Sequence, residues 1–195
     1  MPSNVVITHL KLVDKQARDK VAALLAGVAQ VARQHPGVVR YAVTIPRDDA
    51  GEDSISVIED VLERPPNITA FVTTASYSRP EVLSLADPFI LIATFDYATN
   101  TRDAALDGWS TVTSACQKTQ QGTLVYAVAK DSRNGDRVGS VAAYESEKYF
   151  WEVHVPGQAV VDNKKKYGDI RTKTDLAYFK LIGGFLFNDK AYSRL

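Results

Sequence analysis

An internal repeat is the feature that most constrains the fold of this chain. Residues 37–43 are GVVRYAV and residues 122–128 are GTLVYAV, so four of the seven positions are identical. The separation of 85 positions between these segments also relates Ile7 to Ile92, which lie in the β-rich runs before them. Sequence identity between the two copies is low elsewhere. The remaining evidence for a repeat is therefore the shared order of the predicted strands and helices. We predict two tandem units, residues 1–88 and residues 89–195.

The first unit shows alternating strand and helix signals. Residues 5–13 form an extended β-rich run, and residues 15–34 have a helical period. The apolar residues of that helix recur on one face, at Val21, Leu24, Leu25, Val28 and Ala32. Pro36 and Gly37 end the helix. Strands at 38–45 and 54–62 then form a hairpin, and Pro65-Pro66-Asn67 predicts the start of a helix that reaches about residue 85.

The second unit repeats this order. We predict strands at 89–98, 123–130, 137–145 and 176–187, a helix at 102–119 and helical residues at 147–167 with a break at Pro156-Gly157. On this alignment Tyr41 matches Tyr126 and Glu59 matches Glu145. The order predicts an α+β protein of two tandem ferredoxin-like repeats that pack as an internal pseudo-dimer.

One element is missing from the first repeat. A ferredoxin-like unit needs a fourth strand after its second helix, yet only Asp87-Pro88 separates that predicted helix from the strand at 89–98. Either the first repeat lacks its fourth strand or residues 89–98 serve both sheets, and the sequence does not choose between these alternatives.

Charge and cysteine content limit the classes of partner and the cell compartment that we expect for this chain. Lys plus Arg and Asp plus Glu each number 23, and the basic run 164–166 lies in a predicted helix, so we expect no nucleic-acid or membrane partner. The single cysteine, Cys116, lies on an apolar helix stripe and is interpreted as a packed thiol. No signal-peptide pattern or apolar membrane span is found, and we expect a cytoplasmic protein.

The repeated pattern resembles a known family. Each copy has a first strand, an amphipathic helix and a G-x-x-x-Y-x-V strand, followed by a third strand that ends near a glutamate, and the second copy adds a helix with His154. This resembles the antibiotic-biosynthesis-monooxygenase-like domains of the dimeric α/β-barrel superfamily. The resemblance covers nearly the whole chain as two tandem domains. It implies a barrel of two sheets with helices outside and a pocket between each sheet and its helices.

The resemblance also implies a chemistry. Members oxidise aromatic, quinol or polyketide-type small molecules with O₂ and without a cofactor or metal, and relatives cyclise, isomerise or degrade haem. Oxidising members often carry a Trp two residues after the third-strand glutamate, where this chain has Val61 and Glu147. Haem-degrading members place an Asn on the first strand, where this chain has Thr8 and Ala93. These departures argue against haem oxidation and weaken the monooxygenase interpretation.

His154 is the candidate catalytic residue. It follows an aromatic run on a short helix, where the family often has a pocket-facing histidine. A histidine of near-neutral pKa can remove a phenolic proton and leave an anion that reacts with O₂. The alternative is a surface or capping histidine beside Pro156. The first repeat has threonines in this region, so a histidine-dependent site exists only once.

Further candidates would bind substrate. Tyr126, Tyr144, Trp151 and Tyr178 could stack on or hydrogen-bond a planar molecule, although strand tyrosines are more often packing residues. His9 and Asp96 lie on the polar face of the first strand of each repeat and could approach each other inside the barrel, or lie at strand ends in water. No metal-ligand spacing or phosphate loop is present in the sequence, and Gly183-Gly184 predicts a bulge.

Two classes of function therefore remain. One is a small cofactor-independent enzyme, a monooxygenase or a non-oxidative cyclase or isomerase, that uses His154 on an aromatic substrate. The other is a non-catalytic ligand-binding barrel. A homodimer is compatible with both. A cavity of a few hundred Å³ beside His154 would favour the enzyme.

Overall fold

The computed structural model describes residues 2–48, 53–63 and 70–192. The strands among them are β1 (Asn4–Lys11), β2 (Val38–Pro46), β3 (Ser54–Val61), β4 (Phe71–Ser78), β5 (Phe89–Tyr97), β6 (Thr123–Asp131), β7 (Arg137–Tyr144) and β8 (Arg171–Phe185). The helices are α1 (Lys15–Gln34), α2 (Arg102–Thr119), α3 (Glu147–Tyr149), α4 (Gln158–Tyr167) and α5 (Asp189–Tyr192), with a 3₁₀ turn η2 (Pro80–Ser84) and a π-helical turn η3 (Phe150–His154).

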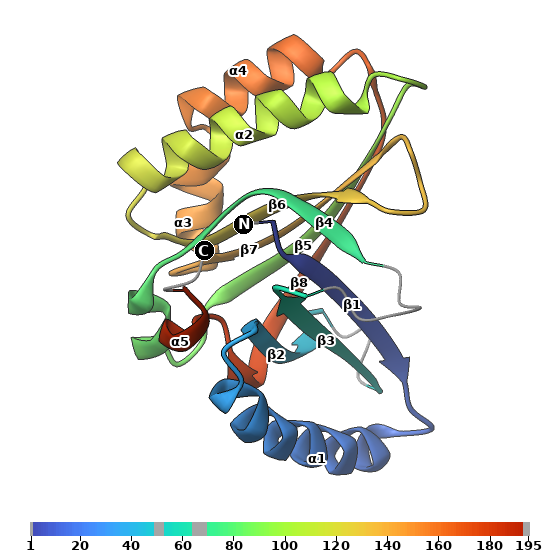
Figure 1. The fold of residues 1–195 in the computed structure, drawn as a ribbon, viewed down its shortest axis with the longest axis vertical. Coiled ribbons are helices and arrows are strands. Elements are labelled where there is room, and N and C mark those ends of the chain that lie inside the picture. Colours follow the sequence, from blue (N-terminus) through green and yellow to red (C-terminus); the bar gives the residue numbers. More distant parts are fainter. Residues whose placement is uncertain (1, 49–52, 64–69, 193–195) are drawn as a thin grey trace.

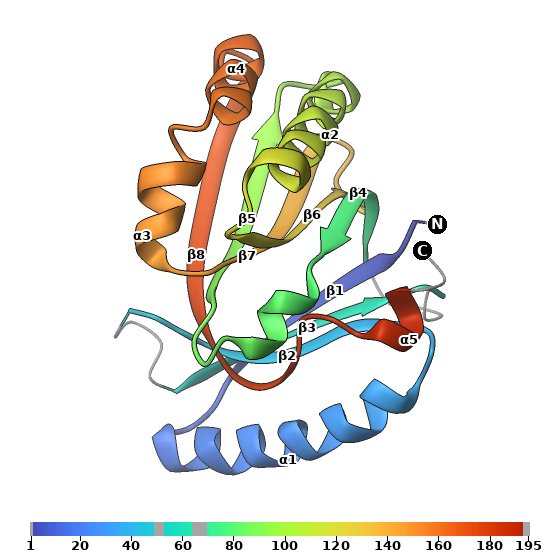
Figure 2. The same ribbon diagram turned by 90° about the vertical axis from the view of Figure 1, so that its left-hand side faces the viewer.

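The described strands close into an antiparallel barrel in the order β1-β3-β2-β8-β5-β7-β6-β4. Helix α1 lies against one side of the barrel, and α2 and α4 lie together on the opposite side (Figure 1). A view turned by 90° shows the long strand β8 running from α4 towards β2 (Figure 2). The predicted α+β barrel of tandem ferredoxin-like repeats is confirmed.

Strand pairing shows how the two halves correspond. In the first half, Ile58 of β3 pairs with Ile7 of β1 and with Ala42 of β2. In the second half, Val141 of β7 pairs in the same way with Ile92 of β5 and with Ala127 of β6. The separation of 85 positions therefore holds for the first two strands of each half. The division into residues 1–88 and 89–195 stays a prediction.

The third strands are not aligned as predicted. Tyr41 pairs with Glu59, and its counterpart Tyr126 pairs with Ala142. Glu59 thus corresponds to Ala142, and the predicted match of Glu59 with Glu145 is wrong. The backbone N–H of Leu62 donates to Gly37 as that of Glu145 donates to Gly122, so Glu145 corresponds to Leu62. Ala42 and its partner Ile58 are 16 positions apart, whereas Ala127 and its partner Val141 are 14 positions apart, so the connection between β6 and β7 is shorter than that between β2 and β3.

The predicted helix at 65–85 is wrong where the structure describes it. Residues 64–69 lie outside the described residues, residues 71–78 form β4, and only the short turn η2 is helical. The segment contains β-branched Val72, Thr73 and Thr74, which suit a strand. It pairs with β6 along its length and with β1 at one end, so barrel closure favours the strand.

Strand β4 also answers the question of the fourth strand. It lies between β1 and β6, as β8 lies between β5 and β2, so the last strand of each half pairs with the first strand of its own half and joins it to the second strand of the other half. Both earlier alternatives are wrong: the first half has its fourth strand, and β5 pairs with β7 and β8, which belong to the second half. Gly184 has φ +88° and an added Cβ would overlap the Tyr41 carbonyl, so the predicted glycine bulge in β8 is confirmed.

Apolar side chains fill the barrel and the space beneath each helix. The interior cluster includes Val5, Ile58, Ile90, Val125 and Phe179. The void that remains beside Val5 and Phe71 measures about 10 Å³, which is too small for a ligand. At one position the interior is polar, because Arg40 Nη1 lies 2.5 Å from Asp60 Oδ2 with both side chains fully buried. In the part of the barrel that the structure describes, this void leaves no room for a ligand.

No helix among the described residues is long and apolar enough to cross a membrane.

Candidate functional site

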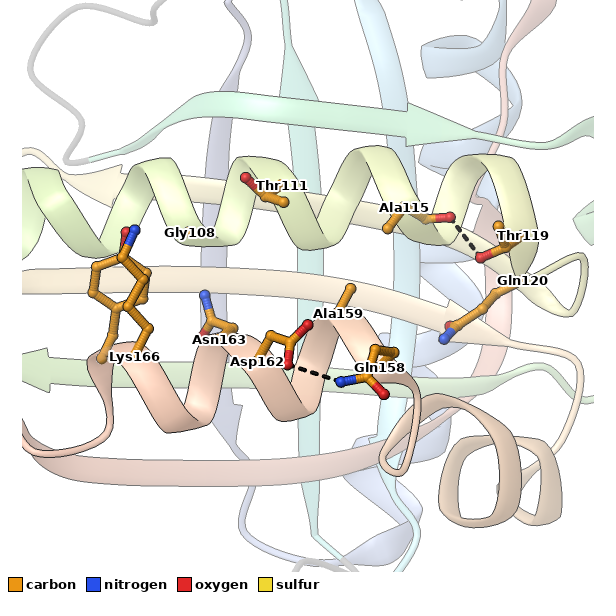
Figure 3. Close-up of a pocket in the computed structure, with 11 residues that line it drawn as sticks. Gly108, Thr111, Ala115, Thr119, Gln120, Gln158, Ala159, Asp162, Asn163 and Lys166 are labelled. Atoms are coloured by element: carbon orange, nitrogen blue, oxygen red, sulfur yellow. Dashed lines mark hydrogen bonds between the residues drawn. The ribbon is translucent and has the colours of Figure 1, made fainter.

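A cleft between α2 and α4 is the candidate site. Its volume is about 440 Å³, within the range of small-molecule pockets. Side chains from both helices line it (Figure 3). They are Thr111, Ala115, Thr119 and Gln120 from α2 and its C-terminal end, and Gln158, Ala159, Asp162, Asn163, Lys166 and Tyr167 from α4, with Gly108 at the far end.

Gly108 allows the two helices to meet. A Cβ at this position would overlap the Tyr167 ring and lie 2.6 Å from Asn163 Nδ2. The absence of a side chain on Gly108 therefore lets α4 close that end of the cleft. Asn163 is 4% exposed, and its Nδ2 has no hydrogen-bond partner among the described residues. A buried amide N–H without a hydrogen-bond partner lowers the stability of the folded state, so the close packing of α2 and α4 at this point leaves one hydrogen bond of Asn163 unmade.

His154 lies at the other end of the cleft, beneath Gln120. Its imidazole is 4% exposed, and its Nδ1 lies 2.8 Å from Gln120 Oε1. An amide oxygen can only accept, so Nδ1 carries the proton and donates. Gln120 also accepts from Thr123 Oγ1 at 3.0 Å, which fixes its carboxamide. Gln120 therefore connects the cleft, which it lines, to the buried histidine.

Burial determines the charge of this histidine. Desolvation lowers the pKa of His154 from 6.5 to about 4, so the imidazole is neutral at pH 7. Within the described part of the chain, Nε2 forms no hydrogen bond, and its lone pair remains available to accept a proton. The expectation of a near-neutral pKa for His154 is therefore wrong, because the side chain is removed from water and has no anionic partner.

Aromatic rings surround His154. Its ring centroid lies 4.8 Å from that of Tyr144, 5.5 Å from Tyr126 and 5.8 Å from Phe150. Burial raises the pKa of both tyrosines well above 10, so they remain protonated donors. The Tyr144 hydroxyl has no hydrogen-bond partner among the described residues, although the side chain is fully buried. The cluster therefore contains a hydroxyl group that lacks a hydrogen-bond partner, next to a neutral histidine.

Tyr178 and Trp151 continue the same aromatic cluster towards the surface. The Tyr178 ring lies 5.3 Å from Phe89, 6.1 Å from Phe150 and 6.2 Å from Trp151, and Trp151 is 48% exposed. Five of the predicted site residues, His154, Tyr126, Tyr144, Trp151 and Tyr178, therefore lie in one cluster.

The other two predicted residues lie elsewhere. His9 Nδ1 is 2.7 Å from Ser56 Oγ, and the His9 ring stacks at 6.5 Å on Phe179. Asp96 accepts from Arg137 Nε at 2.6 Å, and this hydrogen bond lowers the pKa of the carboxyl. His9 and Asp96 form no ion pair or hydrogen bond with each other in the described structure.

Cys116 is part of the packing around His154. Its Sγ lies 3.7 Å from His154 Nδ1, and the side chain is 1% exposed. Burial raises the pKa of the thiol to about 12, so it is not a nucleophilic thiolate at neutral pH. The predicted packed thiol is confirmed. In the described residues no group of three or more His, Cys, Asp or Glu side chains is arranged to hold a metal.

Sequence reasoning missed Gln120 and Asn163. Both are ordinary polar residues at helix positions, and no spacing or motif marks them. Gln120 follows the last residue of α2 and precedes Gly122, a place where the sequence indicates only a helix end.

Comparisons with known proteins agree with the barrel. A candidate monooxygenase from Lactobacillus acidophilus matches 95% of this chain and 99% of its own, at a TM-score of 0.74 and 8% identity. The two proteins therefore share the same barrel fold. A ferredoxin-fold protein from Listeria monocytogenes, related to antibiotic biosynthesis monooxygenases, matches 92% of this chain and 94% of its own (TM-score 0.59, 9% identity).

An anthrone oxidase-like protein also has this fold and matches 95% of this chain and 96% of its own, at a TM-score of 0.58 and 12% identity. No family model matches the sequence, and no curated protein matches it significantly. At these identities the comparisons show the fold alone.

Proposed function

We propose that this chain is a cofactor-independent, monooxygenase-like enzyme that acts on a small aromatic, quinol or polyketide-type molecule. The cleft between α2 and α4 would admit the substrate, and His154 would act as the base. One observation carries the proposal: a buried, neutral histidine has its Nδ1 proton fixed by Gln120, which itself lines the cleft.

The geometry gives each group a role. Nε2 of His154 would accept a proton from a phenol or an activated C–H group, while Gln120 stabilises the resulting imidazolium through Nδ1. The unpaired Tyr144 hydroxyl would donate to the substrate oxygen as it becomes negative. The carbanion of a substrate such as an anthrone would then add O₂ to form a peroxide anion, which takes back the proton from His154 and loses water to leave a carbonyl group. Tyr126 and Phe150 are buried and pack against the imidazole of His154, which holds the base in place.

The low pKa of His154 restricts the substrate. A base with a pKa of about 4 is weak, so it removes a proton only where the resulting anion is strongly stabilised. Hydroquinones and anthrones meet this condition, because their anions are delocalised over the ring system. A simple alcohol does not.

The experiment is to incubate the protein with a panel of anthrones and hydroquinones and to follow O₂ uptake. His154→Gln and His154→Ala should each lower turnover by about 10²–10⁴-fold, the usual contribution of a general base. His9→Ala, outside the aromatic cluster, should have a smaller effect. Full activity in both His154 variants would remove the proposed base. Turnover without O₂ uptake would indicate a cyclase or isomerase instead.

A non-catalytic ligand-binding barrel is the second candidate. It is favoured by the 4% exposure of His154, because substrate must displace neighbouring side chains before it reaches Nε2. Under this alternative the same aromatic panel would bind in the cleft, as measured by calorimetry, and none of its members would be consumed.

A further inference from the structure

A second groove lies on the opposite side of the barrel, between the C-terminal half of α1 and strands β2 and β3. Its volume is about 550 Å³, which is larger than the cleft between α2 and α4. Its walls are mostly apolar. They consist of Val28, Val31, Ala32, Gln34, His35, Pro36, Val38, Tyr41, Glu59 and Val61.

The strand register identifies this groove with the place of His154 in the other half. Tyr41 of the groove corresponds to Tyr126 of the second half. Val61 corresponds to Tyr144, because Val61 pairs with Val38 as Tyr144 pairs with Thr123. Tyr126 and Tyr144 are the tyrosines whose rings contact His154. The groove is therefore the counterpart of the socket that Phe150 and His154 fill in the second half.

Among the described residues nothing fills this counterpart. The second half places α3, η3 and α4 between β7 and β8, whereas the described residues between β3 and β4 contain no helix. As a result Val28 is 48% exposed and Val31 is 74% exposed, although both line the groove. In α2 the apolar side chains Val112 and Cys116 are 0% and 1% exposed.

One acidic group distinguishes the groove from its counterpart. Glu59 replaces the methyl group of Ala142 and lies beside Tyr41 on the neighbouring strand. Among the described residues the Glu59 carboxylate forms no ion pair or hydrogen bond. Partial burial raises the pKa of this carboxyl, and burial together with the nearby charge of Glu59 raises the pKa of Tyr41. A carboxylate with no cationic partner in an apolar groove attracts a cation or a hydrogen-bond donor.

We propose that the groove beside α1 is a second ligand site, which binds an aromatic molecule that carries a protonated amine. The ring takes the place that Phe150 and His154 occupy in the other half and packs on Tyr41 and the valines of α1. The ammonium group pairs with Glu59. This site is independent of the function proposed for the cleft between α2 and α4, since it shares no residue with it.

Three naphthalene probes of one ring system and different charge test the proposal. Titration calorimetry would measure the binding of 1-naphthylmethylamine, 1-naphthalenemethanol and 1-naphthoate to the full chain. The amine should bind about tenfold or more tightly than the alcohol, the effect expected of one partly buried ion pair, and the acid should bind most weakly. Amide resonances of Val31 and Tyr41 should shift on addition of the amine.

Glu59→Gln should lower the affinity for the amine to that for the alcohol. Glu145→Gln is the matched control, because it removes the same charge from an exposed position outside the groove and should leave the affinity unchanged. Thermal melts of both variants would confirm that they fold. Equal binding of the three probes, no binding, or an unaltered amine affinity in Glu59→Gln would each overturn the proposal. The proposal would also be overturned if sedimentation shows a dimer and the amine leaves the α1 resonances unchanged.

Discussion

The carboxamide of Gln120 and the imidazole of His154 form a hydrogen bond of 2.8 Å that fixes the proton of His154 on Nδ1. Because Gln120 also lines the cleft, one residue couples the ligand-accessible space to a buried side chain.

Replacing Gln120 tests this coupling. Gln120→Met removes the strong acceptor and leaves the buried Nδ1–H with only the weakly accepting Cys116 Sγ, which should cost about 1–3 kcal/mol of unfolding free energy. The ¹⁵N chemical shifts of the imidazole should show a single tautomer in the parent protein and a mixture in the variant. Thr119→Val is the control, since Thr119 lines the same cleft but its hydroxyl donates to Ala115. An unchanged tautomer in Gln120→Met would contradict the assignment.

The depressed pKa of His154 predicts how stability depends on pH. In the folded state this pKa is about 4, compared with 6.5 for an unperturbed histidine. Between these values the unfolded chain binds more protons, so the stability due to neutral His154 is complete above pH 6.5 and is lost as the pH falls towards 4. The loss should total about 3 kcal/mol. Urea unfolding of the parent and of His154→Gln at several pH values measures the difference. Equal slopes for both proteins would contradict the prediction.

The buried pair of Arg40 and Asp60 predicts a double-mutant result. At the same register position the second half pairs Val125 with Ala143, so the fold accepts apolar residues there. Arg40→Met alone leaves Asp60 buried without its cation and should cost about 3–5 kcal/mol. Arg40→Met combined with Asp60→Val should recover most of that loss. Denaturant unfolding of the two single variants and the double variant measures the coupling, and strictly additive effects would show that the pair does not act as a unit.

Gly108 predicts the consequence of filling the contact between α2 and α4. Gly108→Ala would push against Tyr167 and Asn163, and we expect a loss of about 1–3 kcal/mol together with weaker binding of aromatic molecules in the cleft. Gly27→Ala in α1 is the matched control. A Cβ on Gly27 meets no atom within 4 Å, and alanine should stabilise that helix by about 0.5–1 kcal/mol. A gain of stability in both variants would contradict the close approach at Gly108.

The duplicated sequence predicts most of the barrel because strand and helix periods are local signals. The segments around Tyr41 and Tyr126, helices α1 and α2, and the bulge at Gly184 follow from patterns of this kind. The pairing of Glu59 was mispredicted because sequence cannot place a length difference within a turn, whereas hydrogen bonding to the neighbouring strand does. Strand β4 was missed because Pro65-Pro66 favoured a helix start, although the pairing of Val72 and Thr73 with β6 determines the outcome.

The candidate site was only partly predictable. The aromatic run before His154 indicated a cluster, and the structure places five of the predicted residues in it. The burial of His154 depends on the π-helical turn η3 and on the end of α2. The two contacting residues, Gln120 and His154, are 34 positions apart in the sequence. No periodicity within a single segment reports such a contact, so neither Gln120 nor the low pKa of His154 could be anticipated.

The joining of the two halves through their last strands has a consequence for synthesis. Tyr41 of β2 pairs with Phe185 of β8, so the ribosome makes the partner of β2 long after β2 itself. Until then β2 presents an open edge, which is prone to pair with other chains. Closure of the barrel therefore follows the synthesis of β8, and a truncation that removes β8 would leave both β2 and β5 without a neighbour on one side.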